Sequence, residues 1–88
     1  MNLSASTSAR IVVGVLRMEQ GNFSAAKGVG AGVSELRFDF GPGYRLYFGK
    51  DGDRLVILLG GGSKKRQQLD IATAHRLWAE YKKRKQEG

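Results

Sequence analysis

The chain opens with an amphipathic pattern. Between residues 5 and 20 the apolar residues fall at helical spacings, and Arg10 and Arg17 lie on the other side. Gly21-Asn22 then supplies a helix stop signal. The pattern predicts a helix over residues 5–20, with an apolar face made of Ile11, Val12, Val15, Leu16 and Met18.

The middle of the chain alternates with the period of a strand. Residues 33–40 carry Leu36 and Phe38 on one face, and charged side chains on the other. Two more strands are predicted over residues 44–49 and 54–59, while the glycine-rich stretch 23–32 is interpreted as a loop. The turn signals between the three strands are Gly41-Pro42-Gly43 and Asp51-Gly52.

These two turns set the expected pairing of the strands. The pairs expected across the first turn are Phe40 with Tyr44, Phe38 with Leu46, Leu36 with Phe48, Arg45 with Asp39, and Tyr47 with Arg37. The pairs expected across the second are Phe48 with Leu55, Leu46 with Ile57, and Tyr44 with Leu59. One face of the sheet then carries Arg37, Arg45, Asp39 and Tyr47 together.

The last strand and the final helix complete the prediction. Residues 55–59 are apolar on both faces, which favours an interior strand with another strand beyond it. A helix is predicted over residues 67–85, with an apolar stripe of Ile71, Ala74, Trp78 and Tyr81. The predicted fold class is α+β: an N-terminal helix packed on a twisted antiparallel sheet of at least three strands, followed by a C-terminal helix. At 88 residues we expect a single domain, residues 1–88.

The charge of the chain changes this picture by indicating a polyanionic partner. The net charge is +7, and residues 63–88 hold eight basic and three acidic residues, against seven and five in residues 1–62. Part of that charge is also typical of a solvated helix end. With no cysteine and one histidine, the sequence excludes disulfides and thiolate metal sites, and we expect no cofactor and no metal. It has no membrane-length apolar run and no secretory signal, so we expect a cytoplasmic protein.

The candidate chemistry is therefore cationic. Arg37 and Arg45 share a sheet face, and the glycine turn at residues 60–62 holds Lys64, Lys65 and Arg66 at the end of the next strand. Fixed guanidinium and ammonium groups stabilise the charge that develops on a phosphate during RNA cleavage by the ribose 2′-hydroxyl. A cross-strand salt bridge is the alternative reading of this face.

Three runs of sequence form a distinctive set. They are residues 32–37, the segment Gly41-Pro42-Gly43-Tyr44-Arg45-Leu46-Tyr47-Phe48, and residues 55–59 with the glycines, lysine and Asp70-Ile71-Ala72 that follow. Together these runs resemble the RelE/ParE toxin superfamily, and most closely its HigB-like "addiction module killer protein" branch. The resemblance covers roughly residues 8–80. It implies a RelE-like fold and the toxin of a type II toxin–antitoxin system, which cleaves mRNA, commonly on the ribosome, and is neutralised by a cognate antitoxin.

By this resemblance the catalytic arginine corresponds to Arg45, and the basic residue of the preceding strand to Arg37. The basic position after the glycine turn falls on Lys64 or Lys65. The tyrosine or histidine that relatives carry further on is absent here, which leaves His75 as a candidate and Asp39, Tyr47 and Asp70 as weaker ones. The full expected nucleic-acid-binding set is Arg37, Arg45, Tyr47, Lys64, Lys65 and Arg66.

Relatives in this branch begin with a strand and another helix, for which this chain has only seven residues. We therefore expect that strand to be missing and its sheet edge to be covered in a homodimer or a strand-sharing oligomer. Operator DNA is expected as a partner only for the toxin–antitoxin complex. Two alternatives stay open: a ParE-like gyrase inhibitor that cleaves nothing, and an inactive, shortened toxin that acts only as a nucleic-acid or antitoxin binding module.

Overall fold

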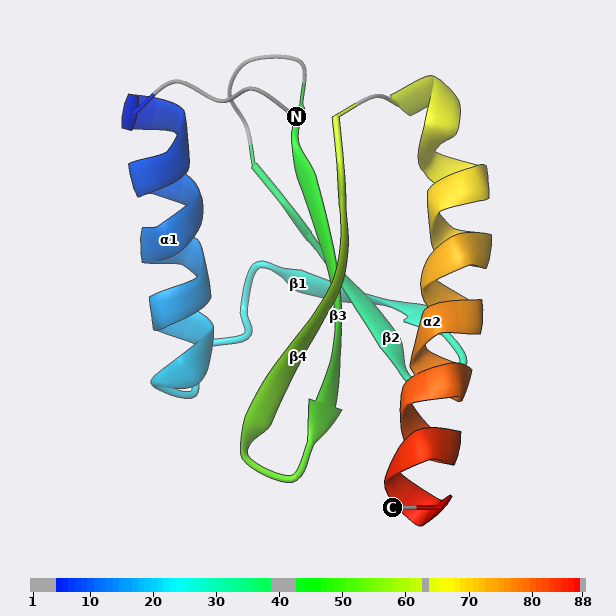
Figure 1. Cartoon of the computed structure of the whole chain (residues 1–88). Coiled ribbons are helices and arrows are strands. Elements are labelled where there is room, and N and C mark those ends of the chain that lie inside the picture. The colour runs from blue at the N-terminus through cyan, green and yellow to red at the C-terminus, as the bar shows by residue number, and fades with distance from the viewer. Residues whose placement is uncertain (1–4, 39–42, 63, 88) are drawn as a thin grey trace.

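Two helices enclose one sheet in the computed structural model, which describes residues 5–38, 43–62 and 64–87. Helix α1 (Ala5–Glu19) covers one face of the sheet, and α2 (Gln67–Glu87) covers the other (Figure 1). The remaining elements are β1 (Ala26–Gly30), β2 (Val33–Arg37), β3 (Arg45–Asp51), β4 (Arg54–Gly61) and the 3-10 turn η1 (Lys64–Arg66). The predicted α+β class is confirmed, with four strands in the sheet.

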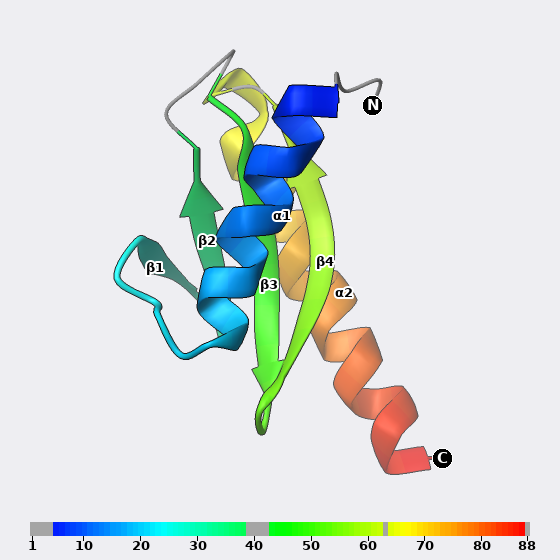
Figure 2. The ribbon, with the colours of Figure 1, turned by 90° about the vertical axis from the view of Figure 1, so that its left-hand side faces the viewer.

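The strands form an antiparallel meander in the order β1-β2-β3-β4 (Figure 2). Among the described residues β4 is therefore an edge strand, and the prediction that it lies inside the sheet is wrong. The strand is apolar on both faces because it contributes side chains to the cores on both sides of the sheet. Leu55 packs in the core cluster on the α1 side, and Val56 and Leu59 pack in the cluster on the α2 side.

Strand β1 lies where a loop was predicted. It pairs with β2 through a two-residue turn, in which Ala31 and Gly32 have φ angles of 56° and 80°. Two positive φ angles are typical of a type I′ hairpin turn. Alanine rarely takes such an angle, and β1 itself has two glycines in five residues. Because glycine is rare in strands and alanine is rare in such turns, residue propensities do not predict this strand.

The pairing of β2 with β3 differs by two residues from the expected one. Leu36 pairs with Leu46, and Arg37 pairs directly with Arg45. Glu35, not Arg37, lies opposite Tyr47. Successive strand side chains point to opposite faces, so a shift of two residues keeps every side chain on its predicted face. The expected pairs that involve Asp39 and Phe40 lie outside the described residues.

The turn between β3 and β4 is also shifted from its predicted place. Asp51 pairs with Arg54, so the turn residues are Gly52 and Asp53 rather than Asp51 and Gly52. A bulge between Tyr47 and Phe48 then offsets the pairing once more. As a result Tyr47, and not Tyr44, lies opposite Leu59.

The sheet carries a small core on each face. On the α1 side, Met18 packs with Leu36 and Phe48. The predicted apolar face of α1 is only partly buried, because Val12 and Leu16 are 54% and 48% exposed. On the α2 side the predicted stripe is confirmed: Ala74 and Trp78 are buried in the core, and Ile71 and Tyr81 pack against it.

Candidate functional site

A cationic pocket of about 300 Å³ opens on the α2 face of the sheet, where α2 begins. It is lined by four basic side chains and one carboxylate, with Gln67 and Ala25 completing the wall. The charged residues are Lys27 of β1, Glu35 and Arg37 of β2, Arg45 of β3, and Lys64 of η1. Three of the predicted site residues, Arg37, Arg45 and Lys64, are thus brought together.

Arg37 and Arg45 are direct cross-strand partners. Side chains so placed lie on the same face with their Cβ atoms about 5 Å apart, and like charges in this arrangement are unfavourable. Arg37 is exposed, whereas Arg45 is only 7% exposed. Two opposed guanidinium groups beside a solvent-open pocket form a favourable site for an anion, which would relieve their repulsion.

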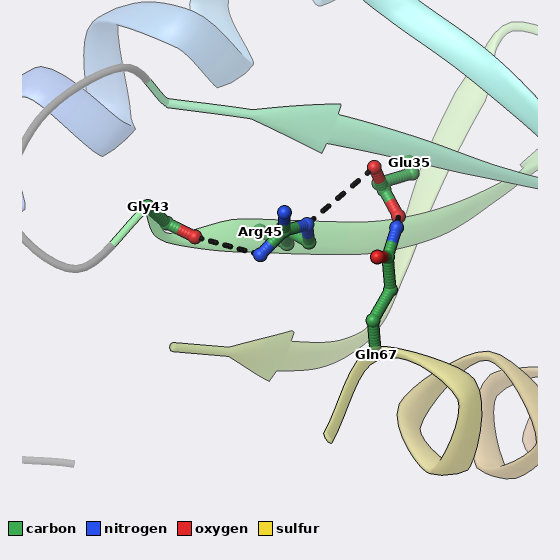
Figure 3. A network of polar contacts seen from close by, with 4 residues as sticks. All are labelled: Glu35, Gly43, Arg45 and Gln67. Atoms are coloured by element: carbon green, nitrogen blue, oxygen red, sulfur yellow. Dashed lines mark hydrogen bonds and ion pairs between the residues drawn. The ribbon is translucent and has the colours of Figure 1, made fainter. Parts of the chain in front are cut away.

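The Arg45 guanidinium makes one hydrogen bond and one ion pair (Figure 3). Its Nη1 donates to the carbonyl oxygen of Gly43 at 3.1 Å, and its Nε lies 3.7 Å from Oε1 of Glu35. The other oxygen of the Glu35 carboxylate accepts a 3.0 Å hydrogen bond from Nε2 of Gln67, the first residue of α2. This network joins β2, β3 and α2 along the wall of the pocket.

Tyr47 lies below the pocket floor and is fully buried. The predicted role of Tyr47 as a nucleic-acid contact does not fit this position. Burial, followed by the nearby charges of Glu35 and Asp70, raises the pKa of Tyr47 to about 12, against the opposing effect of Arg45. The phenol therefore stays protonated at neutral pH.

Asp70 faces Tyr47 from the first turn of α2 and is 8% exposed. Its carboxylate fits against β4 because residue 61 is a glycine. A Cβ added to Gly61 would lie only 2.6 Å from Oδ2 of Asp70. A carboxylate in the first turn of a helix is also favoured by the helix dipole. Asp70 is therefore packed against Gly61 of β4, close to Tyr47.

The remaining predicted site residues lie elsewhere. Lys65 and Arg66 share η1 with Lys64 but are not among the described residues that line the pocket. The Nε2 atom of His75 lies 2.9 Å from the carbonyl oxygen of Val29, so this histidine ties α2 to the edge strand β1. Asp39 lies outside the described residues.

Sequence reasoning missed three polar residues of the pocket, Lys27, Glu35 and Gln67. Alternation placed Glu35 on the charged face of its strand but gave no reason to make it a site residue. Lys27 pairs with Glu35 across the β1–β2 ladder and lies on the same face of the sheet. It went unnoticed because residues 23–32 were interpreted as a loop. Gln67 was placed correctly at the start of the last helix, but only the tertiary structure brings its amide to Glu35.

The described part of the chain has neither a metal-ligand cluster nor a membrane-spanning helix. In residues 5–38, 43–62 and 64–87, no cluster of three or more acidic or histidine side chains is placed to hold a metal ion. Neither helix in those ranges is long and apolar enough to cross a membrane.

The sequence of the chain is similar to that of a bacterial protein. No family model matches the chain, and no solved structure matches it. The chain is 46% identical over 66 residues to an uncharacterized protein of Haemophilus influenzae, and the match spans 75% of this chain and 67% of that protein. At this identity and coverage, the chain belongs to the same protein family as the Haemophilus influenzae protein.

Proposed function

We propose that this protein is a metal-independent RNA endonuclease, the toxin of a type II toxin–antitoxin system of the RelE/ParE superfamily, HigB-like branch, acting in the cytoplasm. The observation that carries the proposal is the convergence of Lys27, Arg37, Arg45 and Lys64 on one pocket. These side chains come from three strands and η1, far apart in sequence. Their common feature is positive charge directed at one small space.

The proposed reaction is attack of a ribose 2′-hydroxyl on the adjacent phosphorus. The bond from phosphorus to the 5′-oxygen breaks, and the products carry a 2′,3′-cyclic phosphate and a 5′-hydroxyl. One proton leaves the 2′-oxygen and one reaches the 5′-oxygen, so no proton is consumed. Negative charge builds on the phosphate oxygens in between, and pocket cations held in advance stabilise it without reorganising.

Arg45 takes the central role because it is the buried cation of the pocket. A guanidinium shielded from water acts on a phosphate with less screening than an exposed one. Lys27, Arg37 and Lys64 are exposed and surround it, where they contact neighbouring phosphate oxygens and attract the RNA. These four residues replace the sequence-based set as the proposed phosphate contacts.

The proposal is tested with purified protein and an end-labelled RNA, alone and on programmed ribosomes. We expect cleavage that leaves 2′,3′-cyclic or 3′-phosphate ends. Arg45→Ala should lower the single-turnover rate by about 100- to 1000-fold, since one buried donor to a developing oxyanion is worth that much. Arg76→Ala is the control, because Arg76 is an exposed helix arginine paired with Glu80. Intact RNA in both settings would refute the endonuclease proposal.

A second candidate function is inhibition of DNA gyrase without cleavage. It is favoured by one observation: among the described residues, those lining the pocket include no histidine and no tyrosine to serve as a proton donor. A gyrase supercoiling assay separates the two functions. Inhibition of supercoiling together with intact RNA would favour the gyrase inhibitor.

The proposed partners follow from the toxin function. They are a cognate antitoxin, mRNA with or without the ribosome, and operator DNA only when the antitoxin is bound. We also propose a homodimer or strand-sharing oligomer. Two observations support it: β4 is an edge strand of the described sheet, and its residue Ile57 is 46% exposed.

A further inference from the structure

The pocket contains one carboxylate, Glu35, although a site that binds phosphate is expected to be lined by cations alone. Glu35 and Arg45 form an ion pair in which both side chains are only 7% exposed. A carboxylate beside the central cation weakens the attraction of the pocket for a phosphate, because the two charges partly cancel. Glu35 therefore does not serve to increase anion affinity.

Stability does not explain the pair either. Bringing a carboxylate and a guanidinium out of water costs several kcal/mol, and replacing such a pair by apolar residues is often neutral or stabilising. Nε of Arg45 is a buried donor, and its 3.7 Å separation from Glu35 is too long for a hydrogen bond. A pair kept for stability alone would bring the two atoms within hydrogen-bond distance.

The contacts of Arg45 fix the orientation of its guanidinium group. The Glu35 carboxylate on β2 lies 3.7 Å from Nε of Arg45 and attracts it as an ion-pair partner. The carbonyl of Gly43, two residues before β3, accepts a hydrogen bond from Nη1. Nη2 is the guanidinium nitrogen that neither contact engages. Glu35 is itself fixed by Gln67, so the Arg45 side chain is braced from the first turn of α2 (Figure 3).

We propose that Glu35 is a positioning residue that orients the Arg45 guanidinium so that Nη2 is presented to the phosphate in the pocket. The role rests on the proposed function for its catalytic consequence. It does not require Glu35 to touch the RNA or to transfer a proton. Gln67 acts one step further away by fixing the Glu35 carboxylate.

A double-mutant cycle tests the positioning in the RNA cleavage reaction. Glu35→Gln should lower kcat by about 10- to 100-fold, the usual effect of misplacing a catalytic group, with KM for the RNA unchanged or lower. Arg45→Lys should also lower kcat. The double variant should be no slower than Arg45→Lys, because lysine has no Nε for Glu35 to hold. Fully additive losses would overturn the proposal.

The pH profile separates positioning from proton transfer. If Glu35 only positions Arg45, kcat of Glu35→Gln falls at all pH values and the shape of the profile is retained. Loss of the acidic limb in Glu35→Gln would instead identify a general base and overturn the positioning role. Glu80→Gln is the matched control, because it removes the same charge from an exposed ion pair and should leave the rate unchanged.

A second measurement does not depend on RNA cleavage. In NMR spectra of the 15N-labelled protein, the Nε–H signal of Arg45 should be resolved and protected from water, and Glu35→Gln should move it and speed its exchange. Gln67→Leu provides a second variant, with the same direction and a smaller effect. An unchanged Nε–H signal in folded Glu35→Gln would contradict the proposal. If the signal responds but RNA stays intact, the endonuclease function fails and the positioning stands.

Discussion

Tyr47 is the single residue whose chemistry the fold alters most. Burial and the charges of Glu35 and Asp70 raise its pKa to about 12. A group whose pKa is raised by folding stabilises the protein fully below its unfolded pKa, about 10 for tyrosine, and loses that contribution as the pH rises through the folded value. The fold therefore resists ionisation of this phenol over the alkaline range.

The resulting prediction concerns alkaline stability. The free energy of unfolding of the wild type should decrease between about pH 10 and pH 12 by more than that of Tyr47→Phe, which has no proton to lose at this position. Urea denaturation at a series of pH values measures both slopes. Equal slopes in the two proteins would contradict the raised pKa.

The arginine pair illustrates what can be read from sequence at this scale. Alternation alone placed Arg37 and Arg45 on one face, and a register error of two residues left that conclusion intact. The same alternation could not reveal that Arg45 would be buried and Arg37 exposed. That difference depends on Glu35 and α2, which approach from elsewhere in the chain.

At the scale of elements, the contact of α2 with β3 depends on a missing side chain. Gly49 lies under the indole of Trp78, and an added Cβ would be 2.6 Å from its Cε3 atom. Gly49→Ala should therefore lower the free energy of unfolding by about 1–3 kcal/mol, the usual cost of overpacking. Gly60→Ala is the control, since its Cβ would meet no heavy atom within 4 Å. Urea melts that show equal stability for the two variants would disprove this packing.

The far end of α2 is tied to the β3–β4 turn through Asp51. The Tyr81 hydroxyl donates to Asp51 at 2.7 Å, and Lys85 contacts the same carboxylate. Hydrogen bonds from Lys85 and Tyr81 lower the pKa of Asp51. The stabilisation is thus present above the usual aspartate pKa and is lost as the pH falls through the lowered one.

Removing this tie should loosen one end of the helix only. Asp51→Asn is expected to speed hydrogen exchange in residues 81–87 and to leave the first turns of α2 unchanged. Asp53→Asn, two residues away in the same turn, is the control. Unchanged exchange in Asp51→Asn would show that the tie does not hold the helix end.

The elements differ in how well the sequence predicted them. Both helices were predicted close to their observed limits, because the apolar spacing and the Gly21-Asn22 stop signal are local features. Strand β1 was missed because its pairing, rather than its composition, makes it a strand. Because Lys27 lies in β1, missing this strand also meant missing Lys27 as a residue of the pocket.

At the scale of the whole molecule, the expected oligomer makes a direct prediction. We expect light scattering at tens of micromolar to give the mass of a dimer, with the β4 edge and its exposed Ile57 in the interface. Ile57→Lys should shift the protein to a monomer. Leu69→Lys, which alters an exposed leucine of α2, should not. A wild-type monomer at these concentrations would contradict the prediction.

In the proposed function a few placed cations, and not the overall charge of +7, act on the RNA phosphate. The most direct test compares single-turnover RNA cleavage by two double variants that remove the same charge. The first variant, Arg37→Ala with Lys64→Ala, removes two positive charges from the pocket. The second, Lys83→Ala with Arg84→Ala, removes two positive charges from the exposed end of α2. We predict that the pocket variant loses at least about 100-fold in rate and the helix variant only a few-fold. Equal losses in the two variants would show that overall charge, and not the pocket, acts on the RNA.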